Sequence, residues 1–264
     1  LQINEQIEQL GANLSVSQNN DYLIIKLQSL SKHFTKLLPL LFEILQDAQY
    51  PEEELEIYRQ QAIQHMHVNL KKSDFVANRT IDELVYGFDH PYGSYSLLED
   101  YNTLTREQVV AFHKEYVKLN LATFFLAGKY ETSLIDAIKA ELNKLTFDNK
   151  ELQSTVLIEK STTEKKHRIT NDEKALQGAI RIANKFVGRE HEDFIPMLFT
   201  NTLFGGYFGS RLMSNIREEK GYTYGIYSFV QQNMQANSYV VATDVGKDVA
   251  EKARRRVLRL IETL

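Results

Sequence analysis

Amphipathic helices and β-hairpins occur in separate blocks along this chain, instead of alternating strictly one by one. Two strands are predicted at 13–19 and 22–30, joined around Asn19-Asn20-Asp21, which is typical of a tight hairpin turn. Apolar residues at helical spacing then predict helices, at 31–47, 51–70, 74–88, 105–119 and 133–145. Helices and strands segregated in this way favour an α+β fold over a doubly wound parallel sheet.

Local signals predict where several of these elements begin. Ser31 and Thr105 stand where a side-chain hydroxyl could cap the free N–H groups of a helix. Pro51 followed by Glu52–Glu54 places a first-turn proline and three acids at the positive end of the helix dipole. Between the last two helices of this half, the apolar run Ala122–Gly128 predicts a further strand.

The polar, Lys- and Glu-rich stretch 149–171 predicts a linker between two domains. We expect a first domain at 1–148 and a second at 172–264, and a chain of 264 residues is long enough for both to bury a core. The second domain is predicted to combine hairpin strands with helices, the last of them basic-faced. Because residue 1 is Leu, we expect this chain to be part of a longer protein, with both domains incomplete.

Composition excludes several classes of function. Thirty-one basic and 35 acidic residues give a net charge of −4, so we expect neither nucleic acid nor an anionic membrane as a partner. The absence of Cys excludes a disulfide framework, a thiolate zinc site and a cysteine nucleophile. No apolar run approaches the ~18 residues of a membrane span. The compartment is left open between cytoplasm and periplasm.

Common motifs for metal and phosphate binding are missing. No two histidines are four residues apart, so neither HExxH nor HxxEH is present. His65 and His67 are the closest pair, but side chains two residues apart on a helix diverge by about 200°. The run FGGYFGSR at 204–211 lacks the Lys-Ser/Thr of a phosphate-binding loop. We therefore expect Gly205, Gly206 and Gly209 to form a flexible turn that opens a helix.

The most informative segment is FGGYFGSRLMSNIREEKGYTYGIYS at 204–228. A helix from Ser210 is predicted to end at Lys220-Gly221, where an aromatic strand follows at once. Such a corner can bring Arg217 and Tyr224 together, and a guanidinium with a phenol suits the backbone carbonyls of an extended ligand. A structural alternative stays open, in which Arg217 neutralises the helix C-terminus and Tyr224 is an ordinary sheet residue.

At this segment the sequence resembles the pitrilysin/insulinase family of zinc metallopeptidases, which includes the mitochondrial processing peptidase. The family pattern GG…SRL…NIRE..G..Y..YS is matched by Gly205-Gly206, Ser210-Arg211-Leu212, Asn215–Glu218, Gly221, Tyr224 and Tyr227-Ser228. The first half agrees in the same order, through IEQLGANLSVSQNNDY, PEEELEIYRQQ, FDHPYG, LTREQVVAFHKEYVKLN and FLAGKY. The resemblance therefore extends over essentially the whole chain.

This resemblance implies two similar domains of the α/β-roll type, each a mostly antiparallel sheet covered by helices. In the family, paired halves close around an unfolded peptide. One half holds zinc through HxxEH and a downstream Glu, and the Glu of the motif is the general base. The other half supplies an Arg and a Tyr seven residues apart, which implies that Arg217 and Tyr224 are substrate-binding residues.

The same resemblance implies a degenerate zinc site. His65 stands where the third zinc ligand, a Glu, belongs, and Tyr58 replaces a supporting Glu two helical turns earlier. Leu14-Ser15-Val16 also departs from the LNA segment, which in the zinc half receives the substrate as an added strand. We therefore expect no catalytic residue, no metal ligand and no cofactor in this chain, with zinc held by the partner half.

The leading hypothesis is a zinc-free half, which pairs with an HxxEH-bearing subunit or domain as a homo- or heterodimer and binds unfolded peptides. Two alternatives stay open. One is an active zinc endopeptidase, with HxxEH before Leu1 and His65 as an unusual ligand. The other is a structural assembly subunit without protease activity.

Overall fold

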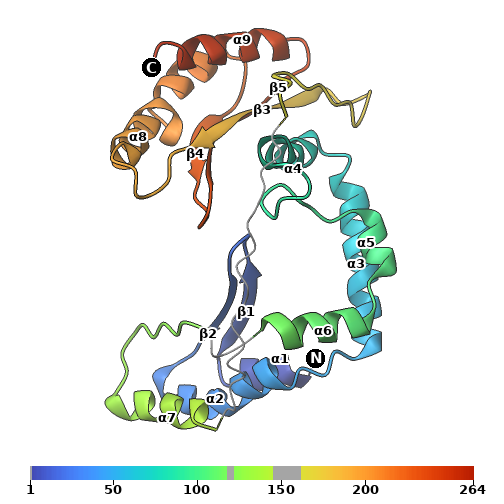
Figure 1. The fold of residues 1–264 in the computed structure, drawn as a ribbon, viewed down its shortest axis with the longest axis vertical. Coiled ribbons are helices and arrows are strands. Elements are labelled where there is room, and N and C mark those ends of the chain that lie inside the picture. The colour runs from blue at the N-terminus through green and yellow to red at the C-terminus, as the bar shows by residue number, and fades with distance from the viewer. Residues whose placement is uncertain (1, 118–121, 145–161) are drawn as a thin grey trace. The chain divides into compact units, whose positions relative to one another are not determined.

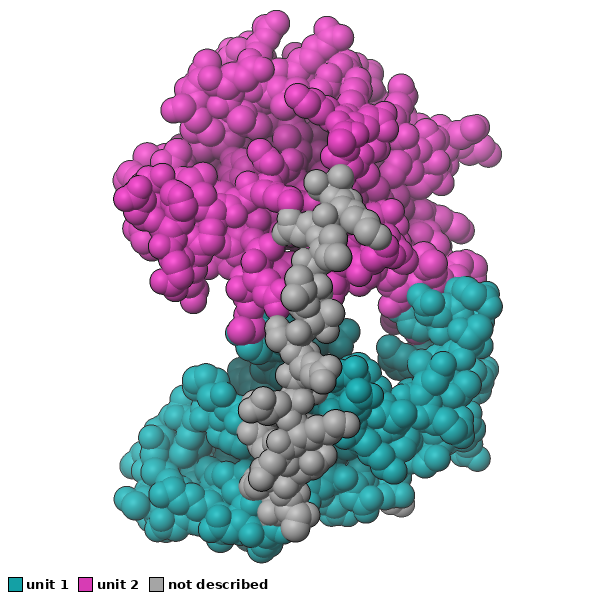
Figure 2. Space-filling model, in the orientation of Figure 1, with its two compact units in different colours: residues 1–60, 99–155 teal, residues 61–98, 156–264 magenta. Residues whose placement is uncertain are grey.

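A computed structural model describes residues 2–117, 122–144 and 162–264. The chain forms two compact units, which Figure 2 distinguishes by colour. Unit 1 consists of Leu1–Gln60 and Glu99–Thr155, and unit 2 of Gln61–Leu98 and Val156–Leu264. These units are interleaved along the sequence, whereas the predicted domains are contiguous. Since 149–161 lies outside the described residues, the predicted linker at 149–171 and its boundaries stay a prediction.

Unit 1 combines a two-stranded antiparallel sheet with helices, as Figure 1 shows. Its elements are α1 (Gln2–Gln9), β1 (Asn13–Gln18), β2 (Leu23–Gln28), α2 (Ser31–Gln46), α3 (Glu52–Asn69), α5 (Leu98–Thr103), α6 (Arg106–Tyr116) and α7 (Thr132–Leu142). Parts of α3 and α5 belong to unit 2. The β1–β2 register runs from Asn13↔Gln28 to Gln18↔Leu23. Asn19 Oδ1 closes the turn by accepting from the backbone N–H of Tyr22 at 2.7 Å. The predicted hairpin is therefore confirmed.

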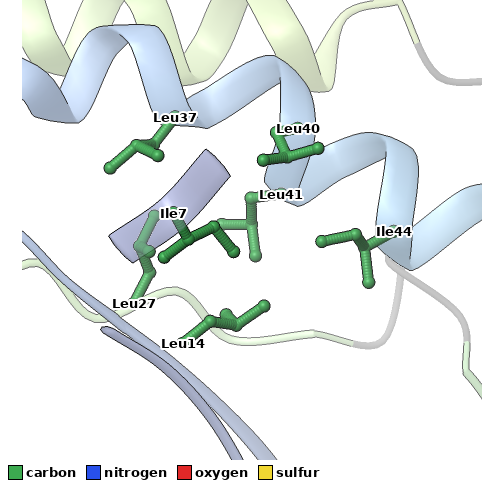
Figure 3. A pocket seen from close by; sticks show the side chains of 7 residues that line it. All are labelled: Ile7, Leu14, Leu27, Leu37, Leu40, Leu41 and Ile44. Atoms are coloured by element: carbon green, nitrogen blue, oxygen red, sulfur yellow. The ribbon is translucent and has the colours of Figure 1, made fainter. Parts of the chain in front are cut away.

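Helix α2 carries the core of unit 1 on two faces. Leu37 packs with Ile7 of α1 and Ala12, whereas Leu38 and Phe42 pack against α7. Figure 3 shows that side chains from α1, β1, β2 and α2 point toward one another at the first face. They are Ile7, Leu14, Leu27, Leu37, Leu40, Leu41 and Ile44. Full burial of a side chain of this kind, as at Ile7 and Leu37, stabilises the fold by about 1.5–3 kcal/mol, and the other five are half-buried.

Some predictions made from local sequence signals in unit 1 are confirmed and others are wrong. Thr105 caps α6 as predicted, because its Oγ1 accepts from Gln108 N–H at 3.3 Å and Gln108 Oε1 accepts from Thr105 N–H at 2.9 Å. The predicted cap at Ser31 is wrong, since its hydroxyl donates to the carbonyl of Lys129 at 2.7 Å. The strand predicted at Ala122–Gly128 is also wrong, because this run pairs with no strand among the described residues.

Unit 2 contains a three-stranded antiparallel sheet in the order β3-β5-β4. Besides the rest of α3, its elements are α4 (Ser73–Tyr86), β3 (Gln177–Phe186), α8 (Phe194–Asn201), the π-helical turns η2 (Thr202–Gly206) and η3 (Met213–Glu219), β4 (Ile226–Gln231), β5 (Asn237–Gly246) and α9 (Ala250–Ile261). Strand β5 pairs with β3 from Gln177↔Gly246 and with β4 from Ile226↔Thr243. Both sheets among the described residues are thus antiparallel, in agreement with the predicted α+β class.

Helices cover the unit 2 sheet on both faces. The main core lies where η3 and α9 meet one face, and its buried members are Phe204, Leu212, Met213, Ile216, Ile226, Val241, Val257 and Leu260. On the other face, α4 packs along β3, and Val85, Tyr86 and Tyr92 form a second buried cluster against Ala183. Ile216, next to Arg217, therefore belongs to the main core, whereas the second cluster lies further along β3.

The helices are of ordinary length and mixed polarity. Helix α3 is 18 residues long and begins with three acidic side chains, and α2 is 16 residues long. Within the described ranges, no helix is both long and apolar enough to cross a membrane.

Candidate functional site

A helix-to-strand corner forms the candidate site. Helix η3 ends at Glu219, and Gly221 just beyond it has a φ of 62°, in the left-handed region that favours glycine. Gly221 N–H donates to Arg217 O at 3.0 Å, and Tyr222 N–H donates to Ile216 O at 3.1 Å. Both bonds span one residue more than those of a Schellman motif, because the π-helical turn is wider than an α-helical one. The chain then turns directly into the loop that carries Tyr224.

Arg217 lies in the last turn of η3 with a half-buried side chain. Its Cζ atom is 4.6 Å from the centroid of the Phe208 ring, which is the geometry of a cation–π contact. Within the part of the chain that the structure describes, its guanidinium makes no hydrogen bond or ion pair. One face of the guanidinium thus contacts the ring, while its N–H donors have no partner among the described residues.

Tyr224 is 91% exposed and lines an open groove on unit 2, with a volume of about 360 Å³. The groove is formed by residues of β3, β4 and β5 and by the loop that leads into β4. Arg217 is not among its lining residues. The structure shows no direct contact between Arg217 and Tyr224, so their common role stays a prediction.

A network of hydroxyl groups holds the loop that carries Tyr224. Thr243 of β5 is 4% exposed, and its Oγ1 lies 2.9 Å from Thr223 Oγ1 and 2.8 Å from Gly225 O. Thr223 Oγ1 also lies 2.7 Å from Asp244 O and accepts from Gly225 N–H at 3.1 Å. Because buried hydrogen bonds of this kind are costly to leave unmade, they fix the backbone on both sides of Tyr224.

Gly205 and Gly206 lie in η2, which continues directly from α8 and ends at Gly206. The prediction of a turn that opens a helix is therefore wrong for these two glycines, whereas Gly209 lies in the turn before the next helix. Gly205 is buried, because η2 packs closely on β4 at Ser228 and leaves no room for a side chain. The glycine is needed here for close approach of two backbones rather than for freedom of the chain.

The positions implied for the degenerate zinc site lie two turns apart on α3. Both Tyr58 and His65 are exposed, and His67 next to them is exposed as well. Among the described residues, no three His, Cys, Asp or Glu side chains gather into a group that could hold a metal ion. A catalytic zinc requires three protein ligands, so the donor set on this helix does not fit one.

Sequence reasoning missed the residues that surround Tyr224. Arg181 and Asp244 come from neighbouring strands, and their side chains meet at 3.0 Å. One signal for Arg181 was present, since it interrupts the apolar run Ala179–Ala183 and a charge there needs a partner. No comparable signal singled out Asp244 or Thr243 at the end of β5.

Comparison with models of known protein families shows which family the chain is related to. The model of the peptidase M16 inactive domain matches residues 103–264, which is more than half of the sequence. The chain belongs to the peptidase M16 inactive-domain family. This confirms the resemblance to the pitrilysin/insulinase metallopeptidases that the sequence motifs indicated.

Individual M16 relatives agree with this assignment. The chain is 19% identical over 275 residues to an uncharacterized zinc protease, YmxG of Bacillus subtilis (strain 168), and spans 63% of that protein. A peptidase M16 inactive domain from Pseudomonas fluorescens superimposes with a TM-score of 0.80 at 22% identity, over 99% of this chain and 64% of that one. A protease from Helicobacter pylori gives a TM-score of 0.85 at 16% identity, over 98% and 64% of the two chains. The fold is therefore that of M16 proteins, with antiparallel sheets covered by helices, and these relatives are longer than this chain.

Proposed function

We propose that this M16 chain is the zinc-free, substrate-binding half of a metalloendopeptidase that cleaves unfolded peptides in a closed chamber. Arg217 and Tyr224 hold the backbone of the peptide, and a partner subunit or domain with HxxEH supplies the zinc. The observation that carries this proposal is the guanidinium of Arg217, which rests on the Phe208 ring without a polar partner among the described residues.

The chemistry of the two side chains fits an extended peptide. Arg217 offers five N–H donors and no acceptor, and Tyr224 adds a phenolic O–H. A peptide in extended conformation presents carbonyl acceptors in a row along each side of its backbone. The contact with Phe208 holds the guanidinium in place before the peptide arrives, which lowers the entropy lost on binding.

The proposal is tested by mixing the purified chain with HxxEH-bearing candidate partners and measuring kcat/KM for an unfolded fluorogenic peptide. Arg217→Ala in the active complex should lower kcat/KM by about 10- to 1,000-fold, which corresponds to about 1.4–4 kcal/mol of lost transition-state stabilisation. Tyr224→Phe removes one donor and should have a smaller effect in the same direction.

A matched control is Arg259→Ala, which removes an exposed arginine from α9, away from the groove. It should leave kcat/KM unchanged. Equal activity of Arg217→Ala and the unmodified complex would show that the assigned role is wrong. Zinc-dependent cleavage by this protein without a partner would favour the active endopeptidase, and neither binding nor cleavage with any partner would favour a structural subunit.

A further inference from the structure

We propose that the outward side of α8 and η2 is the docking surface for the zinc-bearing partner, and that this partner presents an uncharged, apolar surface to it. The docking surface, here called the α8–η2 face, consists of Ile195, Phe199, Leu203, Tyr207 and Phe208. This inference rests on the proposed function, because it assumes a partner with HxxEH. It adds where that partner binds and which chemistry holds it.

The α8–η2 face is uncharged along its whole length. Residues 194–210 contain no Asp, Glu, Lys, Arg or His, although 25% of the whole chain is charged. The inward side of this segment is buried, as at Phe204, which is 1% exposed. Ile195, Phe199 and Leu203 follow one another at intervals of four residues, which places them in a row on the other side. The segment is therefore apolar on both sides, and a helix of that kind is normally buried.

Helix α9 of the same unit shows what a solvent-facing surface of this protein looks like. Its inward side chains, such as Val257, are buried. Its outward positions include the exposed Lys252, Arg255 and Arg259. On α8 and η2 the outward positions instead carry aliphatic and aromatic side chains, and the five residues of the α8–η2 face are between 49% and 69% exposed. Contact with water alone therefore does not account for these residues.

The exposed area of the α8–η2 face is large enough for a protein–protein interface. A fully exposed aromatic residue presents about 150–250 Å², so five large residues at half to two-thirds exposure give roughly 600 Å². One side of a standard interface is about 800 Å². The centre of such an interface is apolar and rich in aromatic residues. The α8–η2 face thus supplies most of one side.

The contact between Phe208 and Arg217 points to the zinc-bearing partner as the occupant. The Phe208 ring belongs to the α8–η2 face, and its centroid lies 4.6 Å from Arg217 Cζ. A peptide that is cleaved must contact both the guanidinium that holds it and the zinc on the partner. Since successive residues of an extended peptide are only about 3.3 Å apart, the partner has to approach the surroundings of Arg217 closely. The α8–η2 face begins at that point, so the approach of the partner covers it.

Thiol labelling tests the docking surface directly, because the chain has no Cys and each variant then contains a single one. Leu203→Cys places the thiol on the α8–η2 face, and Lys252→Cys places it on the exposed side of α9 as the matched control. Intact mass spectrometry follows the reaction of each variant with N-ethylmaleimide, alone and with a saturating amount of the HxxEH-bearing partner that supports cleavage. The partner should slow labelling of the Leu203→Cys variant at least about tenfold, because the reaction of a thiol requires access to it. Labelling of the Lys252→Cys variant should stay unchanged.

A second pair of variants separates docking from peptide binding. Phe199→Ala should weaken binding of the partner at least about tenfold in surface plasmon resonance, because aromatic residues at the centre of an interface carry much of its affinity. With saturating partner, its kcat/KM should equal that of the unmodified complex. Arg217→Ala should do the reverse, with a lower kcat/KM and an unchanged affinity for the partner. Circular dichroism shows whether each variant is folded.

Other outcomes overturn the inference. Equal labelling of the Leu203→Cys variant with and without the active partner shows that the partner binds elsewhere. Slow labelling of this variant alone shows that the face is already covered, by a second copy if the rate depends on protein concentration and by the chain itself if it does not. If Arg217→Ala still lowers kcat/KM in these cases, the proposed function stands and only the docking surface is wrong. Failure of every HxxEH-bearing partner to bind overturns both proposals.

Discussion

Gly205 of η2 approaches Ser228 of β4 so closely that a Cβ atom on Gly205 would lie 2.3 Å from Ser228 Oγ and 2.6 Å from Ser228 N. The same Cβ would lie 2.8 Å from Leu212 Cδ1, in the main core of unit 2. Backbone and core atoms cannot move away as the end of a flexible side chain could. The end of η2 and the strand that follows Tyr224 are therefore packed together without spare room.

Gly205→Ala should lower the free energy of unfolding by about 1–3 kcal/mol, because overpacking at this contact forces the backbone to shift. Urea denaturation followed by circular dichroism measures the change. Gly206→Ala is the matched control, since its Cβ would meet its nearest neighbour at 3.4 Å. That variant should be as stable as the unmodified chain or slightly more stable. A Gly205→Ala variant of unchanged stability would contradict the close contact.

Thr243→Val tests the hydroxyl network under the Tyr224 loop. Valine keeps the shape of the side chain but removes the hydroxyl that lies 2.9 Å from Thr223 Oγ1 and 2.8 Å from Gly225 O. We expect a loss of about 1–2 kcal/mol in the free energy of unfolding, since the buried partners lose a hydrogen bond. Thr200→Val removes an exposed hydroxyl from α8 and should change stability much less. Equal effects of the two variants would show that the network does not stabilise the loop.

Asp82 of α4 should make stability depend on pH. Burial raises the pKa of Asp82 from 3.8 to about 6, although a hydrogen bond with Gln231 acts in the opposite direction. The folded chain thus binds this proton more tightly than the unfolded chain, so stability falls as pH rises from about 4 to about 6. Above that range the destabilisation is complete, and we expect it to be about 1 kcal/mol, because the group is only partly buried.

Asp82→Asn should therefore raise the free energy of unfolding at pH 7 and flatten its dependence on pH. Urea denaturation at a series of pH values measures both effects. Asp136→Asn, at an exposed position of α7, should leave the pH dependence as it is. If the curves of Asp82→Asn and the unmodified chain run parallel between pH 4 and pH 7, the ionisation of Asp82 does not contribute.

The side chains of α3 lead to a prediction about the zinc content of the purified chain. A catalytic zinc needs three protein ligands, and Tyr58 and His65 replace the two carboxylates that the M16 resemblance places there. Elemental analysis of the purified chain should find far less than one zinc per chain, and His65→Ala should not change that amount. A stoichiometric zinc that His65→Ala removes would instead support the active endopeptidase.

Local sequence signals predicted the structure correctly where the hydrogen bonds join residues that are close together in the sequence. The Asn19 turn and the Thr105 capping box are examples, because each is closed by bonds between residues two or three apart. The signals failed at Ser31 and Gly205, where the deciding contact is made by a residue distant in the sequence. The hydroxyl of Ser31 bonds Lys129, 98 residues away, and Gly205 packs against a strand that follows a further helix.

By itself, the sequence determined the α+β class, the M16 relationship and the position of Arg217 and Tyr224 at one corner. These features depend on the order of motifs and on a short helix-to-strand turn, in which Gly221 sets the direction of the chain. Only the tertiary structure decided what surrounds Tyr224. Arg181 and Asp244 are 63 residues apart in sequence and meet because the register of β3 against β5 places them on one face. Strand register is set by which face of each strand is buried and by the connections between strands. The residues next to Arg181 or Asp244 in the sequence do not identify the partner strand.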